Sequence, residues 1–202
     1  MKEKTHIIPH HHLVSSDDRF QVNGHRGMTV WLTGLSGSGK STIASRLEQL
    51  LLEEGIHTYI LDGDNIRTGL NKGLTFTSDD RKENLRRIAE VSKLFVDAGI
   101  VVLSAFIAPL RSDRAMVENI IGKNHYLEVF VNTSIEECEN RDVKGLYKKA
   151  RNGEISNFTG ISAPYEEPKN PALNIETQTD SVEDSAQRIL DYLLKDRKIK
   201  EI

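Results

Sequence analysis

The nine residues GLSGSGKST at positions 34–42 constrain this chain more than any other stretch. They follow the apolar run MTVWLT (28–33) and precede IASRLEQLLLEE (43–54). Gly34, Gly39, Lys40 and Ser41 match the pattern G-x-x-x-x-G-K-[ST] between a predicted strand and a predicted helix, a context in which backbone N–H groups surround phosphate oxygens. Lys40 would bring a positive charge to the β- and γ-phosphates, and Ser41 would bind Mg²⁺. The sequence therefore predicts a nucleoside triphosphate site, with expected contacts at Gly34, Leu35, Ser36, Gly37, Ser38, Gly39, Lys40, Ser41 and Thr42.

Short apolar runs alternate with helical patterns along the rest of the chain. The predicted strands are 28–33, 57–62, 100–104, 126–131 and 172–176, and the predicted helices are 40–54, 79–98, 112–121, 134–140 and 181–195. Thr77 and Asp80 form a possible capping box before the second helix, and Gly99 follows its end. Alternating strands and helices favour an α/β fold, a five-stranded parallel sheet with helices on both faces.

Two regions do not follow this alternation. Residues 1–27 suggest an irregular N-terminal arm, and the remaining residues, 28–202, suggest a single domain. Residues 144–171 contain three glycines and three prolines, which favours a mobile flap, or lid, over regular structure. We therefore expect a P-loop domain of the kinase type that carries a lid.

The composition limits the possible partners and location. The chain has 27 basic and 30 acidic residues and a net charge of −3, so we expect no nucleic-acid partner. Its two basic stretches, RKENLRR (81–87) and RDVKGLYKKAR (141–151), suit a small polyanion better. No apolar run approaches the roughly 20 residues of a membrane helix, so no membrane association is expected. The lone Cys138 and the polar N-terminus favour the cytoplasm.

Other motifs distinguish the classes of nucleotide-binding protein. A GTPase would carry D-x-x-G and then N-K-x-D, but NKGL (71–74) lacks the final Asp and DVKG (142–145) follows it in the wrong order. A motor or transporter ATPase usually ends a later strand with a metal-holding Asp, which IVVLSAF (100–106) lacks. An acid at the tip of the strand after the phosphate loop, as in ILDGDN (60–65), is typical of small-molecule kinases.

Asp62 and Asp64 leave the carboxyl end of the second predicted strand, where open α/β sheets bind ligands. If this segment is extended, both carboxylates point the same way, toward the γ-phosphate. One could orient Mg²⁺ through water while the other accepts a hydroxyl proton. The sequence does not say which Asp has which role. In the alternative interpretation, Asp62 merely caps the turn that follows it.

Arginines near the start of the second helix suggest an anion site. Arg81 and Asn84 lie three residues apart on one side of this helix, shortly after Arg67. A guanidinium near a helix N-terminus opposes the helix dipole, so its presence is easier to explain if an anion binds there. Arg86 and Arg87 also fit a solvated helix face.

The flap and the loop before the second helix supply further candidates. The flap lysines Lys144, Lys148 and Lys149 could close over the transferring phosphates and exclude water, or could lie on a charged surface helix. Phe76 and Phe158 flank polar or glycine residues, so each could stack on a base or anchor a core.

Taken with these motifs, the chain resembles the adenylylsulfate kinase family. The resemblance runs from GHRG (24–27) through GLSGSGKST, LDGDNIRTGLNKGLTF, DRKENLRRIAEVSKLFVDAGIVVLSAFIAP and RDVKGLYKKARNGEISNFTGI. The phosphate loop is generic, whereas DGDN, RKEN and KGLYKKAR together are specific. The resemblance implies transfer of a phosphoryl group from MgATP to the ribose 3′-hydroxyl of adenylyl sulfate in sulfate assimilation. A homodimer is implied in the same way.

The resemblance also implies roles for individual residues. Lys40, Asp62 and Asp64 would be catalytic, Ser41 and Asp62 would hold Mg²⁺, and Arg141 would lie against the ATP base. Phe76 and Phe158 would sandwich the adenine of the acceptor, and Lys144 would reach its phosphosulfate. The full set of expected acceptor contacts is Asp62, Gly63, Asp64, Asn65, Arg67, Phe76, Arg81, Asn84, Phe106, Ile107, Lys144, Asn157 and Phe158.

One position departs from the family pattern. Where the family commonly reads FISP, with a serine described as a phosphoserine intermediate, this chain reads FIAP with Ala108. Alanine cannot accept a phosphoryl group, so we expect direct in-line transfer.

Two other readings compete with this one. From the residues alone, the acceptor could be a nucleoside monophosphate, gluconate or shikimate. A non-catalytic nucleotide-binding module is a third possibility, although such a module need not keep carboxylates beside the phosphate.

Overall fold

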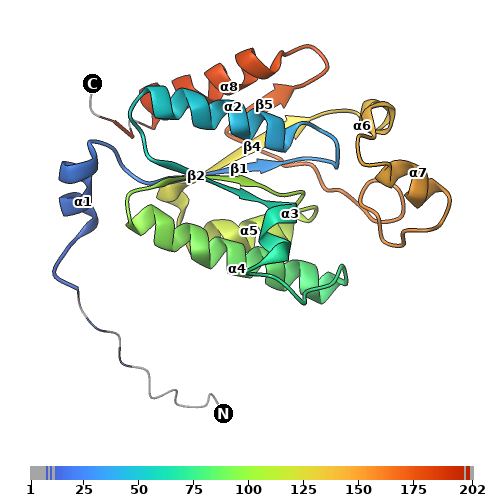
Figure 1. The fold of residues 1–202 in the computed structure, drawn as a ribbon, viewed down its shortest axis with the longest axis horizontal. Helices are drawn as coiled ribbons and strands as arrows, with labels where there is room; N and C mark the ends of the chain where they lie inside the picture. Colours follow the sequence, from blue (N-terminus) through green and yellow to red (C-terminus); the bar gives the residue numbers. More distant parts are fainter. Residues whose placement is uncertain (1–7, 9, 11, 198, 201–202) are drawn as a thin grey trace.

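A five-stranded parallel sheet forms the centre of the molecule (Figure 1). The computed structural model describes residues 8, 10, 12–197 and 199–200. The strands are β1 (Met28–Thr33), β2 (Thr58–Asp62), β3 (Val101–Ala105), β4 (Tyr126–Asn132) and β5 (Leu173–Glu176), in the order β2-β3-β1-β4-β5. Every neighbouring pair is parallel, and each strand lies within one residue of its predicted bounds. The predicted sheet is confirmed.

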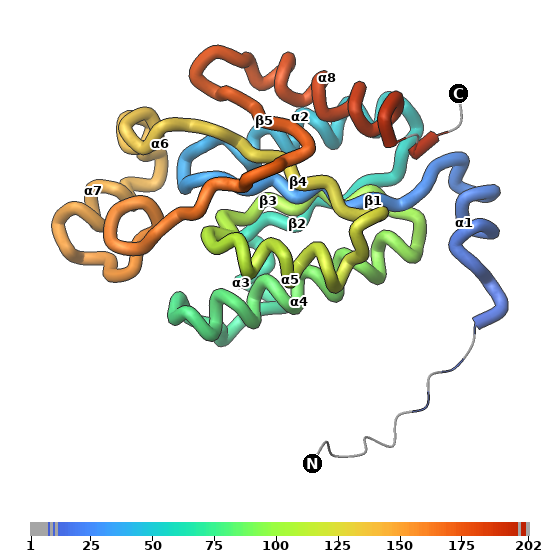
Figure 2. Tube along the Cα trace, turned by 180° about the vertical axis from the view of Figure 1, so that it is seen from behind, coloured from blue at the N-terminus to red at the C-terminus, as the bar shows by residue number. Residues whose placement is uncertain are grey.

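Helices cover both faces of this sheet, as predicted (Figures 1 and 2). On one face, α2 (Lys40–Glu53) and α8 (Val182–Asp191) close an apolar core that includes Val30, Leu47 and Ile189. On the other face, α4 (Ser78–Asp97) and α5 (Arg111–Ile121) pack over Trp31, Val102 and Tyr126. The central strands β1 and β3 are buried along their whole length, which explains their continuous apolar sequences.

The ends of α4 depend on local hydrogen bonds. At its start, the Thr77 hydroxyl accepts from the Asp80 backbone N–H at 3.3 Å. The predicted capping box is only half formed, because the Asp80 carboxylate accepts from the N–H and hydroxyl of Thr75 instead of the N–H of Thr77. At the other end, Gly99 has φ of +85° and donates to Val96 O, while Ile100 donates to Phe95 O. This is the Schellman arrangement that ends a helix at a glycine.

Two short helices lie where no helix was predicted, and a third lies where a charged surface helix was the alternative interpretation. They are α1 (Ser16–Asn23), α3 (Gly63–Thr68) and α7 (Leu146–Arg151). The prediction of a wholly irregular arm was wrong for residues 16–23, where Ser15 and Asp18 form a complete capping box. Residues 1–7, 9 and 11 lie outside the described part of the chain. The flap also contains regular structure, since α7 occupies part of 144–171.

The remaining elements complete the connections. Helix α6 (Ile135–Arg141) follows β4, a 3₁₀ turn covers Lys123–His125, and the last helix continues as a π-helical turn at Tyr192–Asp196. The phosphate loop, α3, α6 and α7 all lie at the carboxyl end of the sheet, whereas α1 lies at the opposite end (Figure 1). Within the described residues, no helix combines the length and apolarity needed to span a bilayer.

Candidate active site

The phosphate loop joins β1 to α2 in a conformation that requires glycine. A Cβ at Gly34 would lie 2.4 Å from Val131 O on the neighbouring strand, so no other residue fits there. Gly39 has φ of +103° and immediately precedes the first turn of α2. The loop therefore opens onto the N-terminus of a helix of 14 residues, where backbone N–H groups and the helix dipole favour an anion.

The Lys40 side chain is buried against this loop. Its Nζ donates to Leu35 O at 2.6 Å, to Gly34 O at 3.0 Å and to Ser38 Oγ at 3.4 Å. Burial removes water from the ammonium and lowers the pKa of Lys40 to about 8. The positive charge is thus held, partly desolvated, directly beneath the loop.

Asp62 connects the tip of β2 to the phosphate loop. One carboxylate oxygen accepts from Ser41 Oγ at 2.6 Å, and the other accepts from the Asp64 backbone N–H at 3.0 Å. The second bond makes Asp62 the N-cap of α3, which confirms the capping interpretation, while its role toward a metal or a phosphate stays a prediction. A hydroxyl and a carboxylate in contact are ligands that Mg²⁺ accepts alongside water and phosphate oxygens, so these two residues fit the metal.

Asp64 does not continue an extended segment. It lies in the first turn of α3, and its exposed carboxylate forms an ion pair with Lys144 from the start of the flap. The hydrogen bond from Lys144 to Asp64 raises the pKa of the lysine. The expectation of two parallel acids on an extended chain was wrong: the carboxylate of Asp62 contacts the phosphate loop, while that of Asp64 contacts the flap.

Two guanidinium groups surround the exposed ring of Phe76. The Arg67 Cζ lies 4.4 Å from the ring centroid and the Arg81 Cζ lies 5.8 Å from it. Arg67 also donates to Leu74 O at 3.1 Å and to Thr75 O at 3.2 Å. Burial lowers the pKa of both arginines from their usual range. Phe76 is 64% exposed. Together with Arg67 and Arg81 its ring forms a surface, here called the cationic platform, that suits an anion attached to an aromatic base.

Arg81 also connects this platform to the flap. Its Nη2 donates to Asn157 O at 2.8 Å, and its Nη1 donates to Thr159 Oγ1 at 3.1 Å. Asn157 has a positive φ of +54° and an exposed side chain. Three residues further along α4 the Asn84 side chain is buried, and its Oδ1 accepts from Asn71 at 2.9 Å.

Phe158 does not share the exposure of Phe76. Only 9% of its surface is exposed, and its ring packs edge-on against Tyr147 with 5.0 Å between centroids. The two rings form a small apolar cluster with Cys138 and Ala150 of neighbouring helices. This burial agrees with the core-anchor interpretation of Phe158, and contact with a base stays a prediction.

The same cluster attaches the flap to the phosphate loop. Tyr147 of α7 donates from its hydroxyl to Ser36 O at 2.8 Å, and its ring is buried. Leu35 and Ile135 pack against the cluster from the loop and from α6. A change in the conformation of the phosphate loop would therefore alter the position of the flap.

A buried arginine connects the other end of the flap to the segment after β3. The Arg114 guanidinium, on α5, donates to Ala108 O at 2.7 Å and to Glu166 O at 2.6 Å, and pairs with Glu128 at 2.9 Å. Only 4% of Arg114 is exposed. Nearby, Thr33 Oγ1 donates to Ile107 O at 2.6 Å, which fixes the expected acceptor contact Ile107 next to the end of β1.

Phe106 and Ala108 belong to the apolar core beneath this segment. Phe106 stacks on Trp31 with 5.4 Å between centroids. Gly63 faces this ring, because a Cβ at Gly63 would lie 3.6 Å from it. Ala108 is 3% exposed and has φ of +41°, so its methyl group points into the core.

Arg141, the last residue of α6, contacts Glu137 on its own helix and Thr177 just after β5. It pairs with Glu137 at 2.8 Å and donates to both the hydroxyl and the carbonyl of Thr177, at 3.1 and 3.0 Å. The Thr177 hydroxyl lies 2.5 Å from that of Thr133, which itself donates to Ser38 O at 3.1 Å. Arg141 is thus connected to the loop through two threonines.

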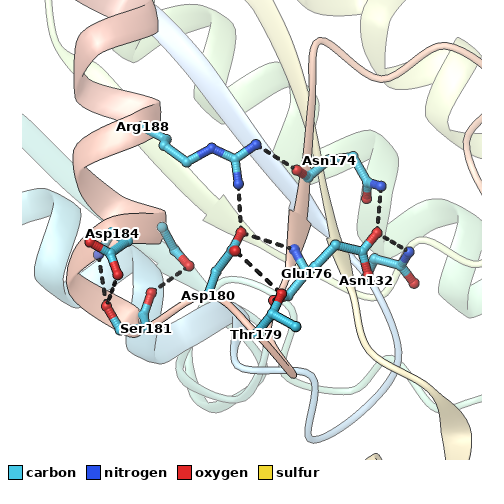
Figure 3. A network of polar contacts seen from close by, with 9 residues as sticks. Asn132, Asn174, Glu176, Thr179, Asp180, Ser181, Asp184 and Arg188 are labelled. Carbon is cyan, nitrogen blue, oxygen red and sulfur yellow. Dashed lines mark hydrogen bonds and ion pairs between the residues drawn. The ribbon is translucent and has the colours of Figure 1, made fainter.

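A polar network fixes the turn that carries Thr177 (Figure 3). Glu176 at the end of β5 accepts from Asn132 at 2.8 Å and from Asn174 at 2.7 Å. Asp180 accepts from Arg188 of α8 at 2.5 Å and from the Glu176 backbone N–H at 3.3 Å. These contacts hold the β5–α8 turn against β4, and so they hold Arg141 in place.

The other predicted residues make fewer contacts. Thr42 and Asn65 are exposed and have no side-chain partner among the described residues. Arg86 and Arg87 both pair with Glu83 on their own helix, which confirms the interpretation of a solvated face. Lys148 and Lys149 are exposed on α7, which agrees with the alternative interpretation of a charged surface helix.

Several residues that organise the site were not predicted from the sequence. Arg114, Val117 and Ile121 follow the apolar spacing of the predicted helix 112–121, so an arginine on that stripe signals a buried partner. Tyr147 is an aromatic residue within the basic run 141–151 of the flap, and an aromatic ring among charged residues likewise signals a buried contact. For Thr177 and Asn71 the sequence carries no comparable signal, because their partners lie far away along the chain.

A phosphate loop after the first strand of an all-parallel sheet, with an acid at the tip of the next strand, defines a P-loop phosphotransferase. The comparisons narrow this class: the family described as adenylylsulphate kinase matches residues 26–176. The chain belongs to the adenylylsulphate kinase family, and it is accordingly a kinase.

Individual relatives agree along almost the whole chain. A probable adenylyl-sulfate kinase of Halalkalibacterium halodurans is 56% identical over 188 residues, 93% of each chain. An adenylyl-sulfate kinase of Bacteroides thetaiotaomicron is 55% identical over 195 residues, which cover 96% of this chain and 97% of that protein. Among solved structures, the Mycobacterium tuberculosis APS kinase CysC in complex with AMPPNP and APS is 50% identical with a TM-score of 0.81, covering 84% of this chain and 98% of that one.

Proposed function

We propose that this chain transfers the γ-phosphoryl group of ATP to the ribose 3′-hydroxyl of adenylyl sulfate, giving 3′-phosphoadenylyl sulfate and ADP in sulfate assimilation. One observation carries the proposal: helix α3 runs from the phosphate loop to the cationic platform. Its cap, Asp62, bonds Ser41, and its last turn carries Arg67 over Phe76. A triphosphate and an anionic nucleotide would therefore meet along six residues of one helix. The relative of known structure holds an ATP analogue together with APS.

On the donor side, the residues 34–42 would bind the triphosphate, with Arg141 against the base. Ser41 and Asp62 would hold Mg²⁺, which supplies charge neutralisation to the β- and γ-phosphate oxygens when it is bound. Lys40 would place its buried charge on the same oxygens. The carboxylate of Asp62 accepts from Ser41, which supports a role for Asp62 on the metal side.

On the acceptor side, Asp64 is the second carboxylate of the site, and it would contact the 3′-hydroxyl of the acceptor. It is exposed at the mouth of the site, next to Lys144. We assign Asp64 to accept the proton of the 3′-hydroxyl as the oxygen attacks the γ-phosphorus. Arg67, Arg81 and Asn84 would bind the acceptor, and Phe76 would stack on its adenine. Phe158 would reach the base only from the edge of its cluster. Gly63, Asn65, Phe106, Ile107, Lys144 and Asn157 complete the proposed contacts.

The transfer would be direct. Ala108 replaces the serine of the family pattern, and its methyl group is buried in the core. A single in-line displacement inverts the configuration at phosphorus, whereas a phosphoenzyme route involves two displacements and retains it. With ATP that is chiral at the γ-phosphate, we expect inversion in the phosphorylated product, as read by ³¹P NMR after isotopic labelling. Retention would require a covalent intermediate at some other residue.

The acceptor itself is tested by a panel. ADP release is measured with adenylyl sulfate, adenosine monophosphate, gluconate and shikimate at matched concentrations. We expect kcat/KM for adenylyl sulfate to exceed the others by at least about a hundredfold, because each lacks the phosphosulfate or the base that the cationic platform would bind. No preference for adenylyl sulfate would contradict the proposed substrate. Nucleotide binding without turnover of any acceptor would favour a non-catalytic module.

We further propose that the protein works in the cytoplasm as a homodimer. The buried, unpaired Cys138 suits a reducing compartment.

A further inference from the structure

Asn71 lies in the turn between α3 and α4 and is completely buried. Its backbone N–H donates to Ile66 O at 3.0 Å, and its carbonyl accepts from Leu74 at 3.1 Å. The stretch NKGL that begins at this residue has no role in the proposed reaction. Polar side chains are rarely buried to this extent without a specific partner, so the amide calls for an explanation.

The partner of the amide is Asn84 on α4. The Asn71 Nδ2 donates to Asn84 Oδ1 at 2.9 Å, and Asn84 itself is only 5% exposed. A side-chain amide has one accepting and one donating end. With the oxygen of Asn84 occupied by Asn71, its Nδ2 is the end that remains for a ligand, and an anionic nucleotide requires donors.

The oxygen of the Asn71 amide, Oδ1, makes no contact that would stabilise the fold. Its Oδ1 is buried and has no hydrogen-bond partner among the described residues. A buried acceptor without a partner loses hydration and receives no bond in return. An apolar side chain of similar size would avoid this loss but would leave Asn84 Oδ1 without its buried donor, so the value of an asparagine here lies in its contact with Asn84. Residues that violate such a packing rule are expected mainly at functional sites.

We propose that Asn71 is a positioning residue that orients the Asn84 amide so that its Nδ2 donates to the acceptor nucleotide. Without Asn71, the Asn84 amide is free to turn its oxygen toward the anion. This inference rests on the proposed function, because it takes Asn84 as an acceptor contact.

The test compares Asn71→Leu and Asn71→Ser with Asn84→Ala and with the double variant Asn71→Leu/Asn84→Ala. For both Asn71 variants we expect the KM for adenylyl sulfate to rise about tenfold, the effect of losing one hydrogen bond to a charged ligand. The KM for ATP should stay within twofold. The melting temperature of Asn71→Leu should change by less than about 4 °C, because the loss of the bond to Asn84 Oδ1 and the removal of the unpartnered Asn71 Oδ1 oppose each other. Ser92→Ala is the matched control, since Ser92 is a buried residue of α4 whose hydroxyl also has no partner among the described residues.

The double variant separates positioning from a structural role. If Asn71 acts only through Asn84, the double variant has the same KM for adenylyl sulfate as Asn84→Ala, because the interaction is already lost. An additional rise in the double variant, a KM within twofold of wild type in either Asn71 variant, or a parallel rise in both KM values with a lower melting temperature would each overturn the inference. No effect of Asn84→Ala would overturn it as well. A wild-type enzyme that does not phosphorylate adenylyl sulfate would instead overturn the proposed function.

Discussion

Replacing Lys40 by alanine is expected to lower kcat by about 10²- to 10³-fold, the usual effect of removing one preorganised donor from a transition state. Negative charge develops on the phosphoryl oxygens during transfer, and a buried ammonium stabilises that charge more than an exposed one does. Burial has already lowered the pKa of Lys40 to about 8, so at pH 7 most molecules carry the positive charge that the reaction needs.

The measurement is ADP release at saturating ATP and adenylyl sulfate. Thermal melting of the variant checks that the loop still folds, because Lys40 also donates to Gly34 O and Leu35 O. Lys93→Ala, an exposed lysine of α4, is the matched control and should keep full activity. Turnover of the Lys40 variant close to the wild-type rate would contradict the proposed donor site.

Asp64→Asn is expected to lower kcat by about 10²- to 10⁴-fold, which is the range for the loss of a general base. The amide keeps the size of the side chain but cannot accept the hydroxyl proton, and it removes the ion pair with Lys144. Single-turnover measurements with adenylyl sulfate would show a slow chemical step with little change in ATP binding.

Asp62→Asn is the informative comparison for the Asp64 variant. If Asp62 serves the metal side, raising the Mg²⁺ concentration should restore part of the activity of Asp62→Asn and none of the activity of Asp64→Asn. Asp196→Asn, at an exposed carboxylate beyond α8, should behave as wild type. Rescue of the Asp64 variant by Mg²⁺ would reverse the two assignments.

The fold was predictable wherever the signal was local and repetitive. Buried parallel strands appear as continuous apolar runs, so β1, β3 and β4 could be located to within one residue. The phosphate loop was predictable because its geometry demands particular residues in order. The contact of Ser41 with Asp62 follows from topology, since both lie at carboxyl ends of the same sheet.

Helices α1 and α3 were missed, and α7 was only an alternative interpretation, because a short polar helix shows no clear periodicity. The first begins at a capping box and the second at the Asp62 cap, so caps and tertiary contacts, not an apolar stripe, define them. Only one residue of α1, Phe20, is buried. For such elements a cap followed by three or four polar residues would have been the signal to use.

Side-chain roles were predictable only in part. Phe76 and Phe158 look alike in sequence, and the presence of Tyr147 across the flap decides that one is exposed and the other buried. The orientation of Asn84 depends on Asn71, which lies 13 residues away on another element. Contacts of this kind follow from packing and leave no local pattern.

The flap is attached at both ends, and this limits how an acceptor can enter. Tyr147 fastens its beginning to Ser36, and Arg114 fastens its return at Glu166. Between these two anchors, the longest largely exposed stretch is 151–157, and it ends at Asn157, whose carbonyl accepts from Arg81. We therefore expect the stretch 151–157 alone to move when a ligand enters, while the two proposed nucleotide sites keep their shape.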